Sequence, residues 1–354
     1  MMRPLVVLLM VLTWCFVWGA SAGAEASAAR RGLGTTSPRN WWAARVLSSC
    51  DAVSPSACWA VGDKGKILKT SDGGHTWTRQ KAPATRWLFD VKFVSDRQGW
   101  VVGAVGKILH TTSGGATWRT QSSGTTQALY AVDFVDARHG WAAGKRGIVL
   151  GASNGGRTWR HLAILSSGDV ADISMADRRH GWVVGPGFTI RHTTDSGRTW
   201  KWQRRNYHDS EYWLSAVRCV DASHCWIAGP GSYSIEENGI EATVDGGVTW
   251  RAQLKSDGGM DTDVSYPCVA LDLSNLSNGW SVGEYCIYHT SDGSAWTRQR
   301  TGVKFTKLTG VTAVSATTAW AVGYFWNENN AAYQPVILHT TDGGATWVHQ
   351  GTRR

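Results

Sequence analysis

The sequence has little of what a helical or membrane-embedded protein needs. Helix formers are scarce, and no stretch beyond the N-terminus keeps a sustained apolar period of 3.6 residues. Charged residues make up only 18% of the chain, and no apolar run after Val17 is long enough to cross a membrane. These absences leave a fold built from strands.

Tryptophan and glycine, by contrast, are abundant and regularly placed. Fourteen of the 22 tryptophans form two sets of seven, and in four consecutive repeats the two sets are 18 residues apart with a repeat length of 41. The first set, each followed by a glycine three residues later, is Trp59, Trp100, Trp141, Trp182, Trp226, Trp280 and Trp320. The second set is Trp77, Trp118, Trp159, Trp200, Trp250, Trp296 and Trp347. A period of this size predicts a stacked or radial array of small units.

Each repeat predicts four short strands. In the second repeat they are Leu88 to Val94, Trp100 to Val102, Lys107 to Thr112 and Thr117 to Gln121, each rich in strand-forming residues and bounded by Gly, Ser or Asp. A lone sheet of this size cannot bury both faces until neighbours pack around an axis. The sequence therefore predicts an all-β, seven-bladed β-propeller over residues 44–354, with blades at about 44–82, 83–123, 124–164, 165–206, 207–255, 256–302 and 303–354.

A second motif precedes the second tryptophan of each repeat. Thr70 to Trp77 reads Ser/Thr-x-Asp-x-Gly-x-Thr-Trp and resembles the Asp-box, or BNR repeat. Asp can accept N–H bonds within its own turn, and Gly permits positive φ, so we expect a structural role for Asp72, Asp195, Asp245, Asp292 and Asp342. Three copies depart from the pattern and should differ in detail: Ser113 and Asn154 replace Asp, and Ser291 to Trp296 is one residue short.

The N-terminus predicts export. Arg3, the apolar run Leu5 to Val17 and small residues after it are typical of a secretory signal over residues 1–22, with cleavage near Ala22, Ala24 or Ala26. Residues 23–43 read as a disordered linker. We therefore expect a secreted, periplasmic, cell-surface or luminal protein.

Six cysteines remain after the leader, and an even number in an exported protein predicts disulfides. Their places on first hairpins favour the local pairs Cys50 with Cys58, Cys219 with Cys225, and Cys268 with Cys286. Metal binding is the alternative, but no His joins them at ligand spacing, so we expect neither a metal nor another cofactor.

A basic residue follows nearly every second-set tryptophan, on the strand expected to be outermost. The set is Arg79, Arg119, Arg160, Lys201, Arg251, Arg298 and, more weakly, His349. Positive charge protects edge strands against pairing with other chains, which is the favoured interpretation. The alternative is a basic rim that attracts an anionic surface or an acidic protein segment, whereas nucleic acid is not expected as the partner of an exported protein.

Three irregular loops point to a binding site. Residues are inserted at Pro230 to Glu241, Tyr324 to Pro335 and Lys255 to Pro267, and such loops open on the face opposite the Asp-boxes. They and the nearby connections carry the candidate partner-binding residues Trp87, Trp213, Tyr233, Glu236, Glu237, Tyr324 and Trp326. The alternative is that these aromatics only pack against one another over the propeller mouth.

An enzyme is the second hypothesis. Asp-boxes resemble those of sialidases, and the repeats resemble half of a two-propeller xyloglucanase. The early Arg-Ile-Pro motif of sialidases and a clear catalytic pair are absent, and the chain has only one propeller. A glycan-active or glycan-binding propeller therefore remains the alternative, with no catalytic residue assigned.

The closer resemblance is to the photosystem II assembly factors, which are seven-bladed propellers. Gly99-Trp-Val-Val-Gly103, followed by Gly106-Lys-Ile-Leu109, and Trp59 to Trp77 carry it. The resemblance covers essentially the whole mature chain and implies a non-catalytic scaffold that binds a protein, in that family a membrane-protein subunit. We expect such a scaffold, as a monomer, using the loops of blades five to seven.

Overall fold

The computed structural model describes residues 46–165, 168–187, 189–204, 213–229, 239–254, 268–300, 302, 306–327, 329 and 331–351. The chain divides into two units, Met1–Asn40 and Trp41–Arg354, and all described residues belong to the second. The predicted signal and linker, residues 1–22 and 23–43, lie outside them.

The second unit contains seven antiparallel sheets of four strands, each formed by consecutive strands. Blade 1 holds β1 (Leu47–Ala52), β2 (Cys58–Gly62), β3 (Lys66–Thr70) and β4 (Thr78–Arg79). Blade 2 holds β5 (Leu88–Phe93), β6 (Gly99–Gly103), β7 (Lys107–Thr111) and β8 (Arg119–Gln121). Blade 3 holds β9 (Leu129–Phe134), β10 (Gly140–Gly144), β11 (Ile148–Ala152) and β12 (Arg160–Ile164). Blade 4 holds β13 (Asp172–Met175), β14 (Gly181–Gly185), β15 (Thr189–Thr193) and β16 (Lys201–Arg204). Blade 5 holds β17 (Ala216–Cys219), β18 (Cys225–Gly229), β19 (Gly239–Thr243) and β20 (Arg251–Leu254). Blade 6 holds β21 (Cys268–Leu273), β22 (Gly279–Gly283), β23 (Ile287–Thr290) and β24 (Thr297–Gln299). Blade 7 holds β25 (Thr306–Ala313), β26 (Ala319–Asn327), β27 (Ala332–Thr340) and β28 (Val348–His349). One-turn 3₁₀ helices η2 (Asp63–Gly65), η3 (Ala104–Gly106) and η4 (Lys145–Gly147) join the second and third strands of blades 1 to 3.

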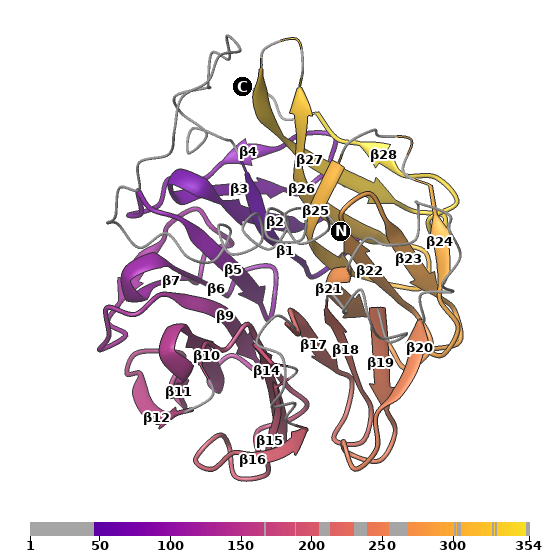
Figure 1. Ribbon diagram of the computed structural model, residues 1–354. Helices are drawn as coiled ribbons and strands as arrows, with labels where there is room; N and C mark the ends of the chain where they lie inside the picture. The colour runs from indigo at the N-terminus through magenta and orange to yellow at the C-terminus, as the bar shows by residue number, and fades with distance from the viewer. Residues whose placement is uncertain are drawn as a thin grey trace, which may run out of the picture. The chain divides into compact units, whose positions relative to one another are not determined.

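The blades stand in a ring around an axis, which confirms the predicted seven-bladed propeller (Figure 1). Blade 1, indigo, lies beside blade 7, yellow, and each is made only of its own consecutive strands. No strand is shared across this junction, so the ring is closed by side-chain and backbone contacts between two complete sheets. We call this junction the seam.

The first-set tryptophans fill the space between blades. Trp100 is fully buried, stacks on Phe134 of blade 3 with centroids 3.5 Å apart, and donates from Nε1 to the Gly155 carbonyl of the same blade at 3.2 Å. On its other side the ring packs against His110, its cross-strand partner in β7. The repeated tryptophan therefore joins each blade to the next, which explains why one appears in every repeat.

Close backbone approach requires the glycine three residues after six of the seven first-set tryptophans: Gly62, Gly103, Gly144, Gly185, Gly229 and Gly323. At Gly103 an added Cβ would lie 2.4 Å from the Trp87 carbonyl oxygen, and at Gly323 it would lie 2.0 Å from that of Lys307. Any side chain at these positions would displace the connection that enters the same blade.

The Asp-box turns have the predicted local hydrogen bonds. In blade 1, the Asp72 carboxylate accepts from the Thr76 N–H at 2.9 Å and from the Thr70 hydroxyl at 2.8 Å. The same pair of bonds recurs at Asp195, Asp245 and Asp342. These bonds hold the pKa of Asp72 at about 2, with the Thr76 hydroxyl and N–H as the largest causes. These carboxylates therefore form hydrogen bonds within their own turns.

The three divergent copies keep the turn by related means. Ser113 Oγ and Asn154 Oδ1 accept from the N–H groups of Thr117 and Thr158 at 3.0 and 3.1 Å. In the shorter copy Asp292 accepts instead from Ser294 and Ala295, both at 2.8 Å. The predicted difference in detail is present in all three.

The turns of each blade define two opposite faces of the ring. Asp-box turns bond to the turn between first and second strands, as from Gly114 N–H to the Arg97 carbonyl at 2.7 Å. The turns between second and third strands bond instead to the connection entering the blade, as from Ala104 N–H to the Trp87 carbonyl at 2.9 Å. We call these the Asp-box face and the loop face.

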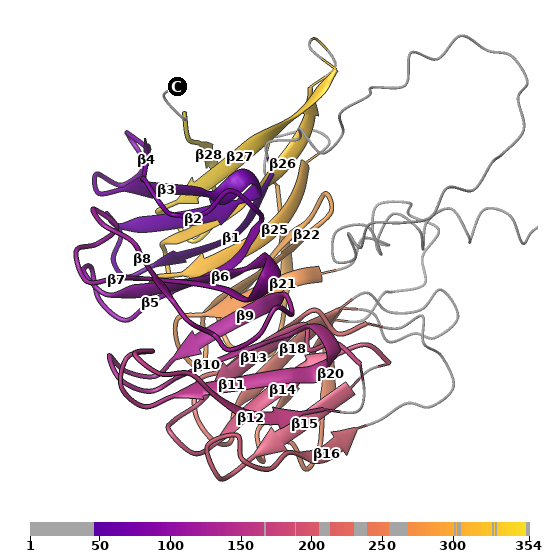
Figure 2. The ribbon, with the colours of Figure 1, turned by 90° about the vertical axis from the view of Figure 1, so that its left-hand side faces the viewer.

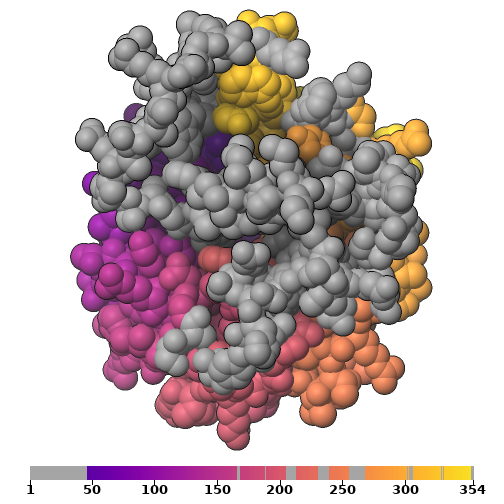
Figure 3. All heavy atoms as spheres, in the orientation of Figure 1, coloured from indigo at the N-terminus to yellow at the C-terminus, as the bar shows by residue number. Residues whose placement is uncertain are grey.

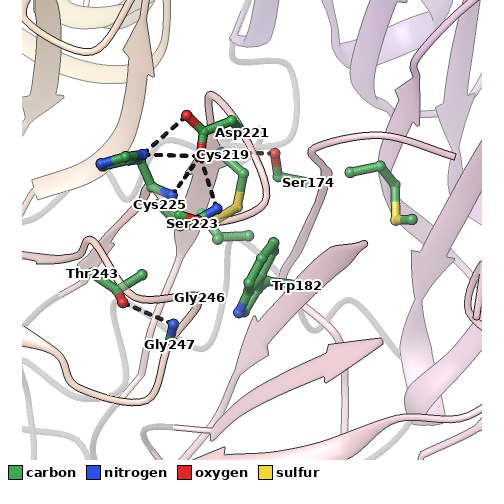
Figure 4. Close-up of a disulfide and its surroundings, with 12 residues drawn as sticks. Ser174, Trp182, Cys219, Asp221, Ser223, Cys225, Thr243, Gly246 and Gly247 are labelled. Carbon is green, nitrogen blue, oxygen red and sulfur yellow. Dashed lines mark hydrogen bonds and ion pairs between the residues drawn. A yellow bond between two sulfur atoms is a disulfide. The ribbon is translucent and has the colours of Figure 1, made fainter. Parts of the chain in front are cut away.

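One predicted disulfide is present, between Cys219 and Cys225 (Figure 4). These residues are direct cross-strand partners in β17 and β18, and the Cys219 N–H donates to Ser174 Oγ of blade 4 at 3.0 Å. Trp182 of blade 4 belongs to the same buried cluster. The disulfide therefore links the two strands of the first hairpin of blade 5, next to blade 4.

The other two predicted pairs are thiols in this structure. Cys50 pairs across the sheet with Ala60 and not with Cys58, and Cys268 pairs with Gly283 and not with Cys286, so neither pair is in direct register. Cys50 and Cys58 nevertheless lie in one buried cluster, as do Cys268 and Cys286. Burial raises the pKa of the Cys58 thiol well above its usual value.

Oxidation of these two pairs is a prediction that alkylation can test. Because both cysteines of each pair lie in one buried cluster, purification from an oxidising medium should protect all four thiols from iodoacetamide under denaturing conditions, and prior reduction should restore labelling. Labelling of all four without reduction would show that the pairs stay reduced.

Candidate functional site

The predicted partner-binding residues fall into three groups. Tyr233, Glu236 and Glu237 lie outside the described residues, as do most of the loops predicted at 230–241 and 255–267. Tyr324 and Trp326 lie on blade 7, and Trp87 and Trp213 lie at the entries to blades 2 and 5. The described residues therefore place four of the seven.

Tyr324 and Trp326 lie on an extended hairpin of blade 7. β26 continues for four residues past Gly323, the position at which the second strand of every other blade ends, and β27 pairs with it along its length. Figure 2 shows this hairpin projecting beyond the other strands of the ring, and Figure 3 shows blade 7 at the upper margin of the molecule. The sequence insertion from Tyr324 to Pro335 is thus an extension of two strands.

Three aromatic side chains pack together on this hairpin. Tyr333 meets Tyr324 edge-on with centroids 5.2 Å apart and Trp326 at 5.0 Å, and 38% of Trp326 is exposed. Burial raises the pKa of Tyr324 above its ordinary range. We call Tyr324, Trp326 and Tyr333 the hairpin cluster. Tyr333 was not predicted, although its pairing opposite Trp326 across a hairpin follows once the strands are extended.

The outer edge of this hairpin is unsuited to binding by strand addition. Ile337 faces the outer edge of β27, since its carbonyl accepts from the Gln350 N–H at 2.8 Å, and Pro335, two residues earlier, faces the same way. Proline has no N–H to offer an added strand. Pro335 therefore removes one N–H donor from the outer edge of this hairpin.

Trp87 belongs to a separate aromatic row at the inner rim of the loop face. Its Nε1 donates to Ser48 Oγ at 2.6 Å, and its ring lies 6.1 Å from Phe89, which in turn meets Tyr130 edge-on at 5.4 Å. The Tyr130 hydroxyl donates to Asp169 at 3.4 Å. The row links blades 1 to 4. Phe89 and Tyr130 were missed, although they occupy equivalent positions in consecutive repeats.

Trp213 lies at the equivalent entry to blade 5 and bridges to Pro186 of blade 4. The loop face thus carries aromatic side chains at four places, on blades 2 and 3, at blade 5, at the exposed Tyr285 of blade 6 and on blade 7. A single binding sector on blades five to seven stays a prediction, since most of its loops lie outside the described residues.

The propeller axis is lined by polar residues that connect neighbouring blades. Carboxylates on the innermost strands accept N–H bonds from the next blade at 2.6 to 2.8 Å: Asp51 from Phe93, Asp90 from Val132, Asp133 from Met175, Asp172 from Val217, and Asp272 from Ala313. At the seam Thr312 Oγ1 accepts from Ala52 at 3.3 Å. We call these residues, with Lys92 and Arg218, the axial belt.

Two cations lie among the five carboxylates of the axial belt. Arg218 Nε is 2.6 Å from Asp272 Oδ1, and Lys92 Nζ is 3.6 Å from Asp133 Oδ1. The Asp272 charge raises the pKa of Arg218 further above its usual value. Burial, reinforced by the charge of Asp90, raises the pKa of Asp172 to about 7, and burial raises that of Asp51 to about 6.

Asp172 should make the stability of the protein depend on pH. Its pKa is raised on folding, so the folded state holds a proton that the unfolded chain loses near pH 4, and its contribution to stability falls as pH rises from about 4 to about 7. In Asp172→Asn this contribution is absent. Urea midpoints measured from pH 4 to pH 8 should therefore fall less steeply toward high pH in the variant than in the wild type, and identical pH profiles would contradict the assignment.

The basic residues after the second-set tryptophans all lie on outermost strands and all are exposed. The fourth strand of blade 1, for example, consists of Thr78 and Arg79 alone. The position expected for edge protection is thus confirmed. Binding of an anionic surface by the same residues stays a prediction.

The described residues contain no group of three His, Cys, Asp or Glu side chains arranged to hold a metal. An open groove of about 640 Å³ between Val105 and Thr126 is lined by hydroxyls, amides and Lys107, with no carboxylate or aromatic ring. Within the same residues, no helix is long and apolar enough to span a bilayer.

Several solved structures are similar to this fold. YCF48 bound to a D1 peptide matches with a TM-score of 0.61 at 17% identity, over 78% of this chain and 90% of that one. YCF48 from Cyanidioschyzon merolae matches with a TM-score of 0.61 at 19% identity, over 78% and 92%. The GH74 xyloglucanase from Xanthomonas campestris matches with a TM-score of 0.63 at 11% identity, over 86% of this chain but only 54% of the enzyme. At these identities the matches show the fold alone. No curated protein matches the sequence.

A family model gives the more specific result. The model of the photosynthesis system II assembly factor YCF48 matches residues 43–120, 80–167 and 162–239, which together cover more than half of the chain. The matched ranges include the Trp-x-x-Gly and Asp-box elements of blades 1 to 4, which join blade to blade and hold the turns. The chain therefore belongs to the photosynthesis system II assembly factor YCF48 family.

Proposed function

We propose that this protein is an exported, non-catalytic scaffold that binds a protein partner through the aromatic side chains of its loop face. Membership of an assembly-factor family supports the scaffold role, and a YCF48 structure with a bound D1 peptide supports a protein as the kind of partner. Export is proposed from the N-terminal leader alone.

The single observation that carries the location of the site is the hairpin cluster. An exposed tryptophan beside two tyrosines, on a hairpin that projects past the ring, has the composition of an interface anchor. Among the described residues the Asp-box face has no such aromatic cluster, and its repeated side chains bond within their own turns. Trp213 and Trp87 extend the aromatic surface along the loop face.

Affinity capture with paired variants tests this proposal. The mature protein and the Trp213→Ala, Trp326→Ala variant are used as baits on the native envelope or medium at moderate salt, followed by mass spectrometry. Trp202→Ala is the matched control, since Trp202 is an equally exposed tryptophan on the outer strand of blade 4. We expect a protein enriched by wild type and control but lost with the double variant, while all three melt at similar temperatures.

The second candidate function is glycan binding or hydrolysis, favoured by the likeness to the xyloglucanase fold. It predicts capture of glycoconjugates by all three baits, or release of sugars from a glycan panel. Either result, without an enriched protein, would reject the scaffold proposal.

A further inference from the structure

The turns of the Asp-box face carry opposite net charge on two sides of the ring. In blades 2 to 4, the turns between first and second strands and the Asp-box turns contain six arginines and four aspartates, a net charge of +2. The corresponding turns of blades 5 to 7 contain no Arg or Lys and four aspartates, a net charge of −4. We call the six arginines the basic sector: Arg97, Arg138, Arg157, Arg178, Arg179 and Arg198.

The basic sector is one continuous, exposed surface. Gln98 Nε2 of blade 2 donates to the Ala137 carbonyl of blade 3 at 3.0 Å, and Arg178 Nε of blade 4 lies 2.9 Å from Asp136 of blade 3. Within each blade the two turns bond to each other through the backbone, to the carbonyls of Arg97, Arg138 and Arg179 from the N–H groups of Gly114, Gly155 and Ser196. All six arginines are exposed. Equivalent turns lie at one height of the ring, so the arginines form a broad layer.

Most of these arginines are available to an external anion, whereas the nearby acids are already bonded. Among the described residues, no ion pair or side-chain hydrogen bond is made by Arg97, Arg138, Arg157 or Arg198. Three of the four aspartates bond within their own turns; Asp136, for example, accepts from the N–H groups of Arg138 and His139 at 2.7 and 2.8 Å. Protection of edge strands does not account for the basic sector, because its arginines lie in turns.

Two departures from the Asp-box pattern add to the positive charge of this sector. Blades 2 and 3 carry Ser113 and Asn154 where the other five blades carry Asp, and both side chains still accept the N–H bond that holds the turn. The turn itself therefore does not require the replacement. Its consequence is electrostatic, since each change removes a carboxylate from the middle of the basic sector.

Exposed apolar side chains lie beside the basic sector on the same face. The residue before the Asp-box threonine is Arg157 in blade 3, Arg198 in blade 4 and Val248 in blade 5. Val248 is 82% exposed, and Val244 in the same turn is 62% exposed. Clustered positive charge next to exposed apolar side chains is the combination that binds the headgroup region of an anionic bilayer.

We propose that the Asp-box face of blades 2 to 5 docks on an anionic membrane surface. The basic sector lies on the lipid phosphates, and Val244 and Val248 lie among the headgroups. A layer of charge spread over three blades suits a broad surface better than a single acidic chain, which needs a groove or a narrow track. A docked molecule turns its loop face away from the bilayer, so this proposal goes beyond the partner site and does not depend on it.

Vesicle flotation of the mature chain tests the docking without any partner. Phosphatidylcholine vesicles are compared with vesicles that also contain phosphatidylglycerol, at about 50 mM and about 300 mM NaCl. We expect binding only to the anionic vesicles, weakened by salt. The triple variant Arg138→Gln, Arg157→Gln, Arg198→Gln should bind at least about tenfold less, with an unchanged Tm because no ion pair is lost.

A matched control removes three exposed charges from the loop face instead: Lys64→Gln, Arg86→Gln, Arg146→Gln. It has the same net charge as the triple variant and should keep its binding within about threefold of the wild type, since its changes lie far from the docked face. Equal losses from the two variants, or no preference for anionic vesicles, would overturn the docking.

Restoring the missing carboxylates gives a second test that does not remove any arginine. Ser113→Asp, Asn154→Asp restores the Asp-box pattern and should leave Tm unchanged or raise it, yet it should lower binding to anionic vesicles at least about fivefold. Val244→Ser, Val248→Ser should weaken binding at least about threefold at both salt concentrations. Unchanged binding in the Asp variant would contradict the proposal.

Acidic polymers distinguish the membrane from other anionic partners. Binding of polyglutamate or DNA through the same arginines, without binding of vesicles, would overturn the proposal in favour of an acidic chain. Because no protein partner enters these measurements, a failure of affinity capture would leave the membrane docking in place, and a failure of vesicle binding would leave the proposed partner site in place.

Discussion

Replacing Arg218 by methionine is expected to lower the free energy of unfolding by about 3–5 kcal/mol. Asp272 lies 2.6 Å from Arg218 Nε, and its side chain is only 10% exposed. Removal of the guanidinium would leave this carboxylate buried among the other acids of the axial belt. Urea unfolding at pH 7.5, followed by tryptophan fluorescence, measures the effect.

Neutralising the stranded acid should restore much of that loss. In Arg218→Met, Asp272→Asn the amide oxygen can still accept from the Ala313 N–H, while the buried charge is gone. A double variant as unstable as Arg218→Met alone would show that lost packing, rather than an unpaired charge, causes the effect. Lys92→Met should cost less, because Lys92 lies 3.6 Å from Asp133 in a looser pair.

Trp100→Ala should be as damaging, at about 3–5 kcal/mol, for a different reason. The change removes a fully buried ring that stacks on Phe134 at 3.5 Å, and it leaves the Gly155 carbonyl without the indole donor. The cavity falls between blades 2 and 3, where two rigid sheets cannot close it. Calorimetry or urea unfolding gives the magnitude.

Trp202→Ala is the control for that prediction, because Trp202 lies on an outermost strand with 36% of its surface exposed and stacks with Arg191 at 3.7 Å. Its loss should cost well under half as much. Equal losses from both substitutions would mean that the inter-blade tryptophans are not the main source of stability.

Much of the fold could be predicted from the sequence, because each repeat contains the same pattern of strand-forming and turn-forming residues. The strands expected at Leu88 to Val94 and Lys107 to Thr112 appear as Leu88–Phe93 and Lys107–Thr111. The strands, the turns and the contacts between blades all depend on residues that recur in every repeat of about 41 residues. Seven copies of the pattern make the strand and turn assignments clear even where a single copy would be ambiguous. The divergent Asp-box turns use the same kinds of donor and acceptor.

The axial belt could not be predicted from the sequence, and the reason is physical. Asp51, Lys92, Asp133 and Arg218 occupy the same place opposite the first-set tryptophans, yet they differ in charge from blade to blade. Their pairing depends on which blades become neighbours, and the repeat pattern reports only what the blades have in common. Similarly, Pro335 suggested a loop, whereas it lies within a strand at an outer edge that needs no N–H.

The sequence predicted which type of side chain would lie on the loop face better than it predicted how these side chains are distributed over the blades. Exposed aromatics on the loop face were expected; Trp326 is exposed there, whereas Trp87 is half-buried. Their separation follows from the ring, since residues close in repeat position can lie on different blades. Tyr333 joined the site because the insertion in blade 7 extends two strands, which periodicity within a single repeat does not reveal.

Site-specific photo-crosslinking tests the central claim most directly. A photoreactive phenylalanine analogue is placed at residue 326 on the hairpin cluster or at residue 160 on the outer strand of blade 3, and each protein is irradiated in its native envelope or medium. The account predicts a protein adduct from position 326 and none from position 160. An adduct only from position 160, or none from either, would contradict binding through the loop face.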